Sequence, residues 1–206
     1  MKIFDFPQYS DDWWDVRRGI PTCSEFRRII TPTTQKLAGA SSNYINFLIA
    51  QKIRMTPNFF TERPMSRAMK DGVELEPQAR NYYAFDRNVE VQQVGFCLSD
   101  CGRYGGSPDG LIGTEGGLEL KCPKVETHVR YLLERKLPDE YAAQVHGHLL
   151  VSGRPWWDFM SYVGPDVDPF IIRVEPNQFT RSLKVVLEQF LEKYEKTIAK
   201  LKGCQP

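Results

Sequence analysis

Three charged residues stand close together in a stretch of the chain that is otherwise apolar. Glu119 and Lys121 are two positions apart in "GLELKCP", and Asp109 lies ten residues before Glu119 in the turn "SPDG". Alternate side chains of a strand share one face, so Glu119 and Lys121 are expected to point the same way. The glycines between 110 and 117 let the chain fold back, which places Asp109 beside Glu119 on the neighbouring strand. This combination of residue types is what metal-assisted phosphodiester hydrolysis requires.

A divalent cation is the expected companion of the two carboxylates. Adjacent carboxylates repel each other unless a proton or a cation lies between them. Oxygen ligands without a nearby pair of thiolates or imidazoles favour Mg²⁺, with Mn²⁺ as a substitute, over zinc. The lysine alongside would neutralise or orient an anionic oxygen, such as that of a phosphodiester or of the attacking water. The simpler alternative is a solvent-exposed strand edge, which an isolated Glu-x-Lys pair usually marks.

The segment 138–153, "PDEYAAQVHGHLLVSG", predicts a helix with polar groups on one face. Tyr141, Gln144, Val145 and His148 share that face at helical spacing. A polar pair, Tyr141 and Gln144, on an otherwise apolar face indicates a buried site. Imidazole is a poor ligand for hard metals, so the three histidines are interpreted as surface or packing residues: His128, His146 and His148.

These groups must be positioned by a mixture of helices and strands. Helical periodicity predicts helices over 41–54, 65–85, 138–153 and 181–202. Short β-type runs separated by turn residues predict strands within 89–121 and at 156–163 and 170–174. The part before residue 85 is predicted to be helical throughout. The order predicts an α/β fold, with helices flanking a central mixed β-sheet.

Length and composition favour one ordinary globular domain. The chain has 206 residues, 41% of them hydrophobic, and we expect a single domain over 1–206. No apolar run is long enough to cross a membrane and no signal-like segment opens the chain, so we expect a cytoplasmic protein. The net charge of +1 offers no global argument for a nucleic-acid partner, although the basic residues of 17–36 would permit a local basic patch.

Four sequence boxes together carry a resemblance to a known family. "SPDG" followed by "LELK" resembles the P-D…(D/E)-x-K signature of the restriction-endonuclease-like nuclease superfamily. "WWDVRRGIPTCSEF" resembles the W-x-x-x-R-x-G-x-x-T-x-S box of the lambda exonuclease, or YqaJ-like viral recombinase, family. "GVELEPQAR" and "YAAQVHGHLLVSG" resemble its G-x-x-x-E-x-x-A-R and Y-x-A-Q helices. The boxes occur in the family's order over about residues 13–153.

The resemblance implies a restriction-endonuclease-like core and a specific activity. The family degrades one strand of linear double-stranded DNA from its 5′ end with Mg²⁺, and it leaves a 3′ single strand for recombination. It works on double-stranded DNA ends as a homo-oligomer, a ring-shaped trimer, and hands the 3′ strand to a single-strand annealing protein. Its setting would be a phage or prophage in the cytoplasm of a bacterial host.

The resemblance also implies roles for individual residues. Lys121 would position or activate the attacking water, and Gln144 would belong to the catalytic group. Tyr141, three residues before Gln144 on the same helical face, would contact the DNA. Glu76 rather than Glu74 matches the helical acid, because its spacing to Ala79 and Arg80 agrees with the box. The implied metal ligands are Asp109, Glu119, Glu76 and the backbone carbonyl of Leu120.

A second implied group would contact the DNA end. Arg17, Ser24 and Ser107 match the residues that hold the 5′-phosphate, and a guanidinium offers two parallel donors to phosphate oxygens. Met69 falls where the family has an apolar wedge against the duplex end. Without the resemblance, Arg17 would be interpreted as a surface arginine, Ser24 as a helix N-cap and Met69 as a core residue.

Three alternatives remain beside the exonuclease. A site-specific or structure-specific endonuclease of the same superfamily would share Asp109, Glu119 and Lys121 but would not need a 5′-phosphate pocket. A non-catalytic DNA-end-binding protein would be expected to have lost one of these residues. An iron–sulfur nuclease would need clustered cysteines, and the five cysteines are irregularly spaced without a C-x-x-C pair, which favours reduced thiols: Cys23, Cys97, Cys101, Cys122 and Cys204.

Overall fold

A mixed four-stranded sheet forms the centre of the fold. The computed structural model describes residues 1–53 and 67–203, and the side chains of these except 67–73. The strand order is β6-β7-β8-β9, in which β7 and β8 are parallel and the other neighbours antiparallel. The strands are β6 (Gly110–Ile112), β7 (Gly116–Lys121), β8 (Trp157–Ser161) and β9 (Phe170–Val174).

Two smaller sheets lie nearer the amino terminus. The first has the order β1-β4-β5 and joins the chain start to the segment before the turn at Asp109. The second is a short hairpin of β2 and β3. The strands are β1 (Lys2–Phe4), β4 (Phe96–Leu98), β5 (Gly105–Gly106), β2 (Ile30–Thr31) and β3 (Lys36–Leu37).

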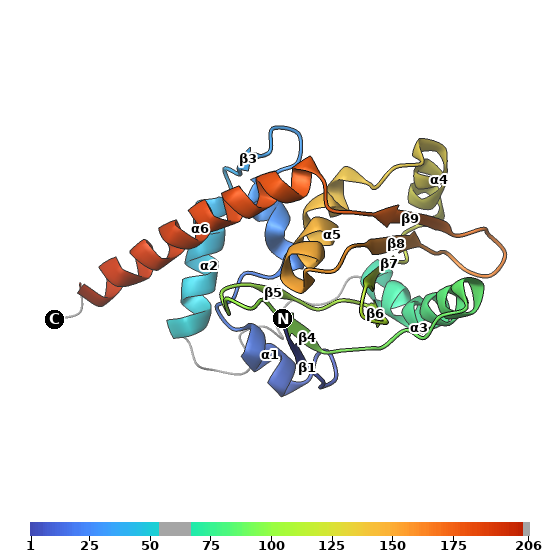
Figure 1. Ribbon diagram of the computed structural model, residues 1–206, viewed down its shortest axis with the longest axis horizontal. Helices are drawn as coiled ribbons and strands as arrows, with labels where there is room; N and C mark the ends of the chain where they lie inside the picture. Colours follow the sequence, from blue (N-terminus) through green and yellow to red (C-terminus); the bar gives the residue numbers. More distant parts are fainter. Residues whose placement is uncertain (54–66, 204–206) are drawn as a thin grey trace.

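Helices cover both faces of the four-stranded sheet (Figure 1). The helix α5 packs on β8 and on the closing helix α6, whereas α3 packs on β7. The helices are α1 (Asp11–Arg17), α2 (Ser41–Ile53), α3 (Arg67–Arg87), α4 (Val125–Glu134), α5 (Asp139–Ser152) and α6 (Gln178–Gly203), with a 3₁₀ helix η1 (Cys23–Arg28).

Alternation along β7 decides which face receives the charged residues. Leu118 and Leu120 are buried in the smaller apolar cluster, together with Ala79 and Tyr83 of α3. Glu119, one position away from each leucine, therefore points to the opposite face, which α5 covers. The face predicted to carry Glu119 and Lys121 is thus the α5 face of the sheet.

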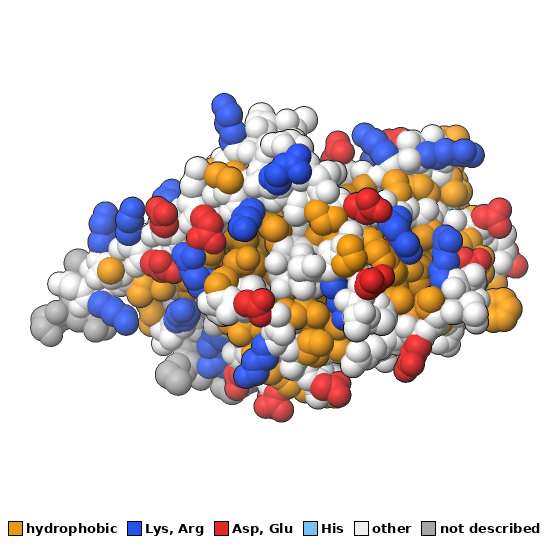
Figure 2. All heavy atoms as spheres, viewed as in Figure 1, with side chains coloured by type: hydrophobic (Ala, Val, Ile, Leu, Met, Phe, Trp, Pro, Cys, Tyr) orange, Lys and Arg blue, Asp and Glu red, His pale blue; other side chains and the backbone are white. Residues whose placement is uncertain are grey.

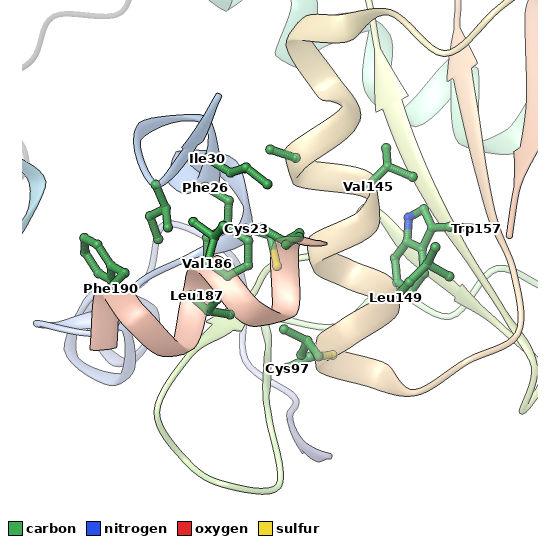
Figure 3. Close-up of a cluster of buried hydrophobic side chains, with 14 of the residues drawn as sticks. Cys23, Phe26, Ile30, Cys97, Val145, Leu149, Trp157, Val186, Leu187 and Phe190 are labelled. Atoms are coloured by element: carbon green, nitrogen blue, oxygen red, sulfur yellow. The ribbon is translucent and has the colours of Figure 1, made fainter. Parts of the chain in front are cut away.

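The larger apolar cluster joins the amino-terminal segment to α5, α6 and the sheet. Its side chains come from η1, α2, α5, β8 and α6, so segments far apart in the sequence share one core. Figure 3 shows part of this cluster, with side chains from η1, β2, α5, β8 and α6: Phe26, Ile30, Val145, Leu149, Trp157, Val186, Leu187 and Phe190. This core holds α5 against the sheet and so fixes its polar face.

The predicted fold class is confirmed, with several local corrections. The helices predicted at 41–54, 65–85, 138–153 and 181–202 are α2, α3, α5 and α6. The prediction of a helical amino-terminal part is incomplete, because β1 and the β2–β3 hairpin lie within it. The helix α1 agrees with the helical interpretation of the amino-terminal part, whereas α4 was not predicted, since a ten-residue helix offers little periodicity. Among the described residues, no helix has the length and apolar content needed to cross a membrane.

Replacing Phe190 by alanine should test whether α6 is an essential part of the core. Phe190 has 0% exposure and its ring stacks 5.6 Å from that of Tyr44. We expect Phe190→Ala to lower the free energy of unfolding by about 3–5 kcal/mol, because it leaves a large cavity. The matched control Phe85→Ala, at a site 88% exposed, should change it by less than about 0.5 kcal/mol. Equal effects in urea denaturation would contradict the packing described.

Candidate active site

The turn before β6 places Asp109 against β7. The antiparallel register pairs Gly110 with Leu118, so Asp109 lies level with Glu119. Its backbone N–H donates to the carbonyl of Leu118 (3.2 Å), and its Oδ2 accepts from the backbone N–H of Leu120 (2.6 Å). The predicted fold-back of Asp109 onto the neighbouring strand is therefore confirmed.

Glu119 is a buried carboxylate between β7 and α5. Its side chain is 1% exposed and forms an ion pair with the ammonium of Lys121. The same oxygen, Oε1, accepts a hydrogen bond of 2.6 Å from Nε2 of Gln144. Lys121 also lies 5.3 Å from the ring centroid of Tyr141. The polar face predicted for 138–153 thus points at the carboxylate of β7, and the exposed-edge alternative is excluded.

His148 is a member of this site that the sequence interpretation missed. Its Nε2 lies 3.3 Å from Oε2 of Glu119, although the two atoms are not aligned for a hydrogen bond. The imidazole stacks on the ring of Trp157, at 4.8 Å between centroids and 10° between planes. The signal was present in the sequence, because His148 follows Gln144 by one helical turn.

The other two histidines pack inside the fold. His128 is 0% exposed, and its ring nitrogens contact the Ser161 hydroxyl (2.8 Å) and the Asp168 carbonyl (3.0 Å). His146 contacts the hydroxyl of Thr180 at 2.8 Å, and burial lowers its pKa to about 4. A packing role is confirmed for both, while a surface location is wrong for all three histidines.

Burial and mutual repulsion set the charges of the three central residues. Burial, and then the negative charge of Glu119, raises the pKa of Asp109 to about 7. Burial would also raise the pKa of Glu119, but the neighbouring Lys121 and His148 together outweigh it and hold that pKa below its ordinary value. Burial disfavours the ammonium of Lys121, yet Glu119 and Asp109 together raise the pKa of Lys121. At neutral pH, Asp109 alone is therefore poised between its two protonation states.

The helix α3 brings a third acid toward the site. Glu76 lines the same cavity as Asp109, whereas Glu74 is exposed, in agreement with the register chosen from the sequence. Burial raises the pKa of Glu76, and the charges of Lys121 and Arg80 partly oppose the shift. Arg80 Nε donates to the backbone carbonyl of Asp109 (3.0 Å), which ties α3 to the turn.

The oxygen atoms at this site fit a hard cation. Oε2 of Glu119 is buried without a hydrogen-bond partner among the described residues, and such an orphaned carboxylate oxygen is available to a ligand. Within the same residues, no three His, Cys, Asp or Glu side chains converge into a ready-made metal group. A cation would therefore be held by the carboxylates of Asp109 and Glu119 with a backbone carbonyl, a set of donors that suits Mg²⁺ or Mn²⁺ rather than zinc.

A second polar group lies at the other end of the same turn. Nη1 of Arg17 and Nε1 of Trp13 each donate to Oγ of Ser107, both at 2.8 Å. The guanidinium of Arg17 also lies 3.9 Å from the ring centroid of Trp13. In the described part of the chain, no carboxylate forms an ion pair with Arg17. Burial lowers the pKa of Arg17 to about 10, so the side chain is still cationic at neutral pH and can receive an anion.

The predicted DNA contacts Ser24 and Met69 are not confirmed by the described part of the structure. Ser24 is exposed, and its Oγ lies 3.4 Å from that of Thr22, with no hydrogen bond to Arg17 or Ser107 among the described residues. Thr22, not Ser24, occupies the cap position of η1, so the N-cap interpretation of Ser24 is wrong. A parallel β-bridge between Thr22 and Gly105 nevertheless brings the start of η1 close to the segment that leads to Ser107. The side chain of Met69 lies outside the described residues.

Residues 12–155 match the YqaJ-like viral recombinase domain. The match covers most of the chain and includes Arg17, Glu76, Asp109, Glu119 and Gln144. The chain belongs to this family. No curated protein gave a match.

Solved structures similar to this chain include exonucleases. LHK-Exo, crystallised in complex with dAMP, is 31% identical over 94% of this chain and 96% of its own, with a TM-score of 0.82. Another structure of this alkaline exonuclease from Laribacter hongkongensis has 28% identity, coverage of 95% and 100%, and a TM-score of 0.75. A phage-related exonuclease from Haemophilus somnus 129PT shares the fold at 12% identity, a TM-score of 0.68, and coverage of 88% and 96%. The fold is restriction-endonuclease-like, and the relatives support a nuclease role of the exonuclease kind.

The protonation of Asp109 should make the stability of the metal-free protein depend on pH. The folded chain keeps this proton up to a pKa of about 7, whereas the unfolded chain loses it near 4. Between these values the native state binds more protons, so the stability from this group falls as the pH rises from about 4 to about 7. We expect metal-free Asp109→Asn to melt at a higher temperature than the wild type at pH 8, but at a similar temperature near pH 4.

Thermal melting across this pH range is the measurement. Asp166→Asn is the matched control, because the side chain of Asp166 is exposed in the segment between β8 and β9. An Asp109→Asn protein that is less stable than the wild type at pH 8 would contradict the repulsion inferred between the two carboxylates.

Proposed function

We propose that this protein is a metal-dependent 5′→3′ exonuclease that degrades one strand of linear double-stranded DNA and leaves a 3′ single strand. The observation that carries the proposal is the cation of Arg17 beside Ser107. The Arg17 cation has no carboxylate partner in the described chain, and Ser107 lies on the turn that also bears Asp109. Because Ser107 and Asp109 are two residues apart, a 5′-phosphate at Arg17 would leave the next phosphate near the acidic site. An endonuclease would have no use for this arrangement.

The side chains have separable tasks in such a reaction. Asp109, Glu119 and the carbonyl of Leu120 would hold Mg²⁺, or Mn²⁺ in its place, with Glu76 approaching from α3. The cation would supply charge to the scissile phosphate and lower the pKa of bound water. Lys121, held between Glu119 and the ring of Tyr141, would orient the attacking water. Gln144 keeps the Glu119 carboxylate in place through its hydrogen bond.

The relatives support the release of mononucleotides. LHK-Exo, 31% identical to this chain, was crystallised with dAMP, a nucleoside monophosphate of the kind that an exonuclease would release. The pocket of Arg17, Trp13 and Ser107 provides donors for the 5′-phosphate of such a product. Ser24 would add a further hydroxyl if the end of the DNA drew η1 and the turn together, and Met69 would press on the terminal base pair.

A ring-shaped homotrimer and an annealing protein that receives the 3′ strand belong to the same proposal and rest on the family resemblance. The surface charges are consistent with enclosure. On the face drawn in Figure 2, Lys and Arg side chains are interspersed with Asp and Glu, and the net charge is +1. Such a surface holds duplex DNA weakly by electrostatics alone, so continued digestion would need the strand to be enclosed. Sedimentation of the purified protein tests the oligomeric state.

Digestion of three substrates should separate the proposed activity from its alternatives. With Mg²⁺, linear duplex should be converted to mononucleotides and 3′ single strands, while closed circular duplex should be spared. Chelation of the metal should abolish the reaction, and Asp109→Ala should be inactive. Cutting of the circle would favour an endonuclease, and an inactive wild type would favour a DNA-end-binding protein.

Removal of the Arg17 cation should affect only ends that carry a phosphate. We expect Arg17→Ala to lower kcat/KM on 5′-phosphorylated duplex by about two orders of magnitude, because a charge-assisted contact to the phosphate is lost. The rate on duplex with a 5′-hydroxyl should change little. Arg18→Ala is the matched control, since Arg18 pairs with Asp15 at the end of the same helix. An equal loss on both ends would refute the 5′-phosphate pocket.

A further inference from the structure

A cavity opens beside Asp109 that none of the groups described so far fills. Its volume is about 480 Å³, within the range of roughly 300–1,000 Å³ that small-molecule sites occupy. One wall is the loop between β1 and α1, and the other is the face of α3 that carries Glu76. The residues that shape it include Phe6, Pro7, Tyr9, Pro77, Arg80 and Asp109. The walls of the cavity therefore include apolar surface, and the cavity ends at the turn that carries Asp109.

The loop that forms the first wall is held in a fixed position. Gln8 Nε2 donates to the carbonyl of Pro108 (3.1 Å) and lies 3.3 Å from that of Val94. Ser10 Oγ donates to the carbonyl of Pro7 (2.7 Å) and accepts from the backbone N–H of Trp13, which caps α1. The cavity is thus built against the same turn that positions Ser107 and Asp109.

Tyr9 has two features that packing does not explain. Its backbone is in the left-handed region (φ 70°), which is strained for an aromatic residue. Its ring is nevertheless 58% exposed, so the conformation is not maintained to bury it. Strained residues held by surrounding structure are concentrated at functional sites. The strained backbone at Tyr9 places this aromatic residue in the lining of the cavity.

Tyr9 lies near both of the groups that would hold successive phosphates. Its ring centroid is 5.0 Å from that of Trp13, whose Nε1 donates to Ser107 in the Arg17 pocket. Tyr9 also lines the cavity together with Glu76 and Asp109, so it lies beside the acidic site as well. A nucleotide whose 5′-phosphate is at Arg17 and whose 3′-phosphate is at Asp109 has its nucleoside between these points.

We propose that this cavity receives the nucleobase of the 5′-terminal nucleotide, with the ring of Tyr9 as its stacking surface. The inference rests on the proposed exonuclease function and adds a subsite to it. Every base has an aromatic face, so stacking on Tyr9 holds any of the four bases without reading the sequence. That tolerance is what complete digestion of one strand requires, and a seated base aligns its 3′-phosphate with Asp109.

A missing base at the DNA end tests the subsite directly. Two linear 5′-phosphorylated duplexes are compared, one with an ordinary terminal nucleotide and one with a tetrahydrofuran abasic residue. The terminal position is left unpaired in both, so that base-pair melting does not differ. We expect the wild type to remove the ordinary nucleotide about tenfold faster, as kcat/KM, and Tyr9→Phe to keep this preference. Tyr9→Gly should lower the ordinary rate to the abasic rate and leave the abasic rate unchanged.

Glycine is chosen because it adopts a positive φ without strain, so Tyr9→Gly should melt no lower than the wild type while it lacks the ring. Phe85→Ala, which removes an exposed aromatic ring elsewhere, is the control. An unchanged preference in Tyr9→Gly, or an equal loss on both ends, would overturn the subsite while the exonuclease proposal stands. Failure of the wild type to digest either end would overturn both.

Discussion

The ion pair between Glu119 and Lys121 is the interaction on which the rest of the site depends. A carboxylate that is 1% exposed is costly to keep charged unless its oxygens are satisfied. One oxygen of Glu119 receives both Lys121 and Gln144, and the other faces His148 without a hydrogen bond. The protein thus neutralises the buried charge on one side only. A cation or a hydrogen-bond donor that contacts the unsatisfied oxygen of Glu119 would therefore stabilise the buried charge most.

This constraint explains why two distant segments must meet at β7. The α5 face of the strand carries Glu119, so α5 must supply polar groups there, and its remaining side chains must bury apolar surface in the core with α6. The opposite face carries Leu118 and Leu120, so α3 can pack on it with Ala79 and Tyr83 while Glu76 reaches the edge of the site. The alternation of side chains along β7 therefore requires apolar contacts from α3 on one face and polar contacts from α5 on the other.

The sequence predicted those parts of the structure that depend on local patterns. Alternation placed Glu119 and Lys121 together, glycine spacing placed Asp109 opposite them, and helical spacing placed Gln144 on the correct face. The role of His148 was missed because residue type was weighed above position, although the residue follows Gln144 by one turn. The contact of Arg17 and Trp13 with Ser107 could not be derived from spacing, since it joins residues 90 and 94 positions apart. The family resemblance, not periodicity, grouped Arg17 with Ser107, and the part that Trp13 plays was not predicted.

The amino-terminal loop was beyond prediction for a different reason. Nothing in "FPQYSDDWW" signals a left-handed tyrosine, because the pattern carries neither glycine nor asparagine at that position. The conformation follows from contacts made elsewhere: Gln8 binds the backbone before Asp109, and Ser10 caps α1. Those contacts fix the residues on both sides of Tyr9 and leave its backbone little freedom. The contact of Gln8 ties the strained backbone of Tyr9 to the same turn that holds Ser107 and Asp109, which keeps this residue near both groups that we propose to bind phosphate.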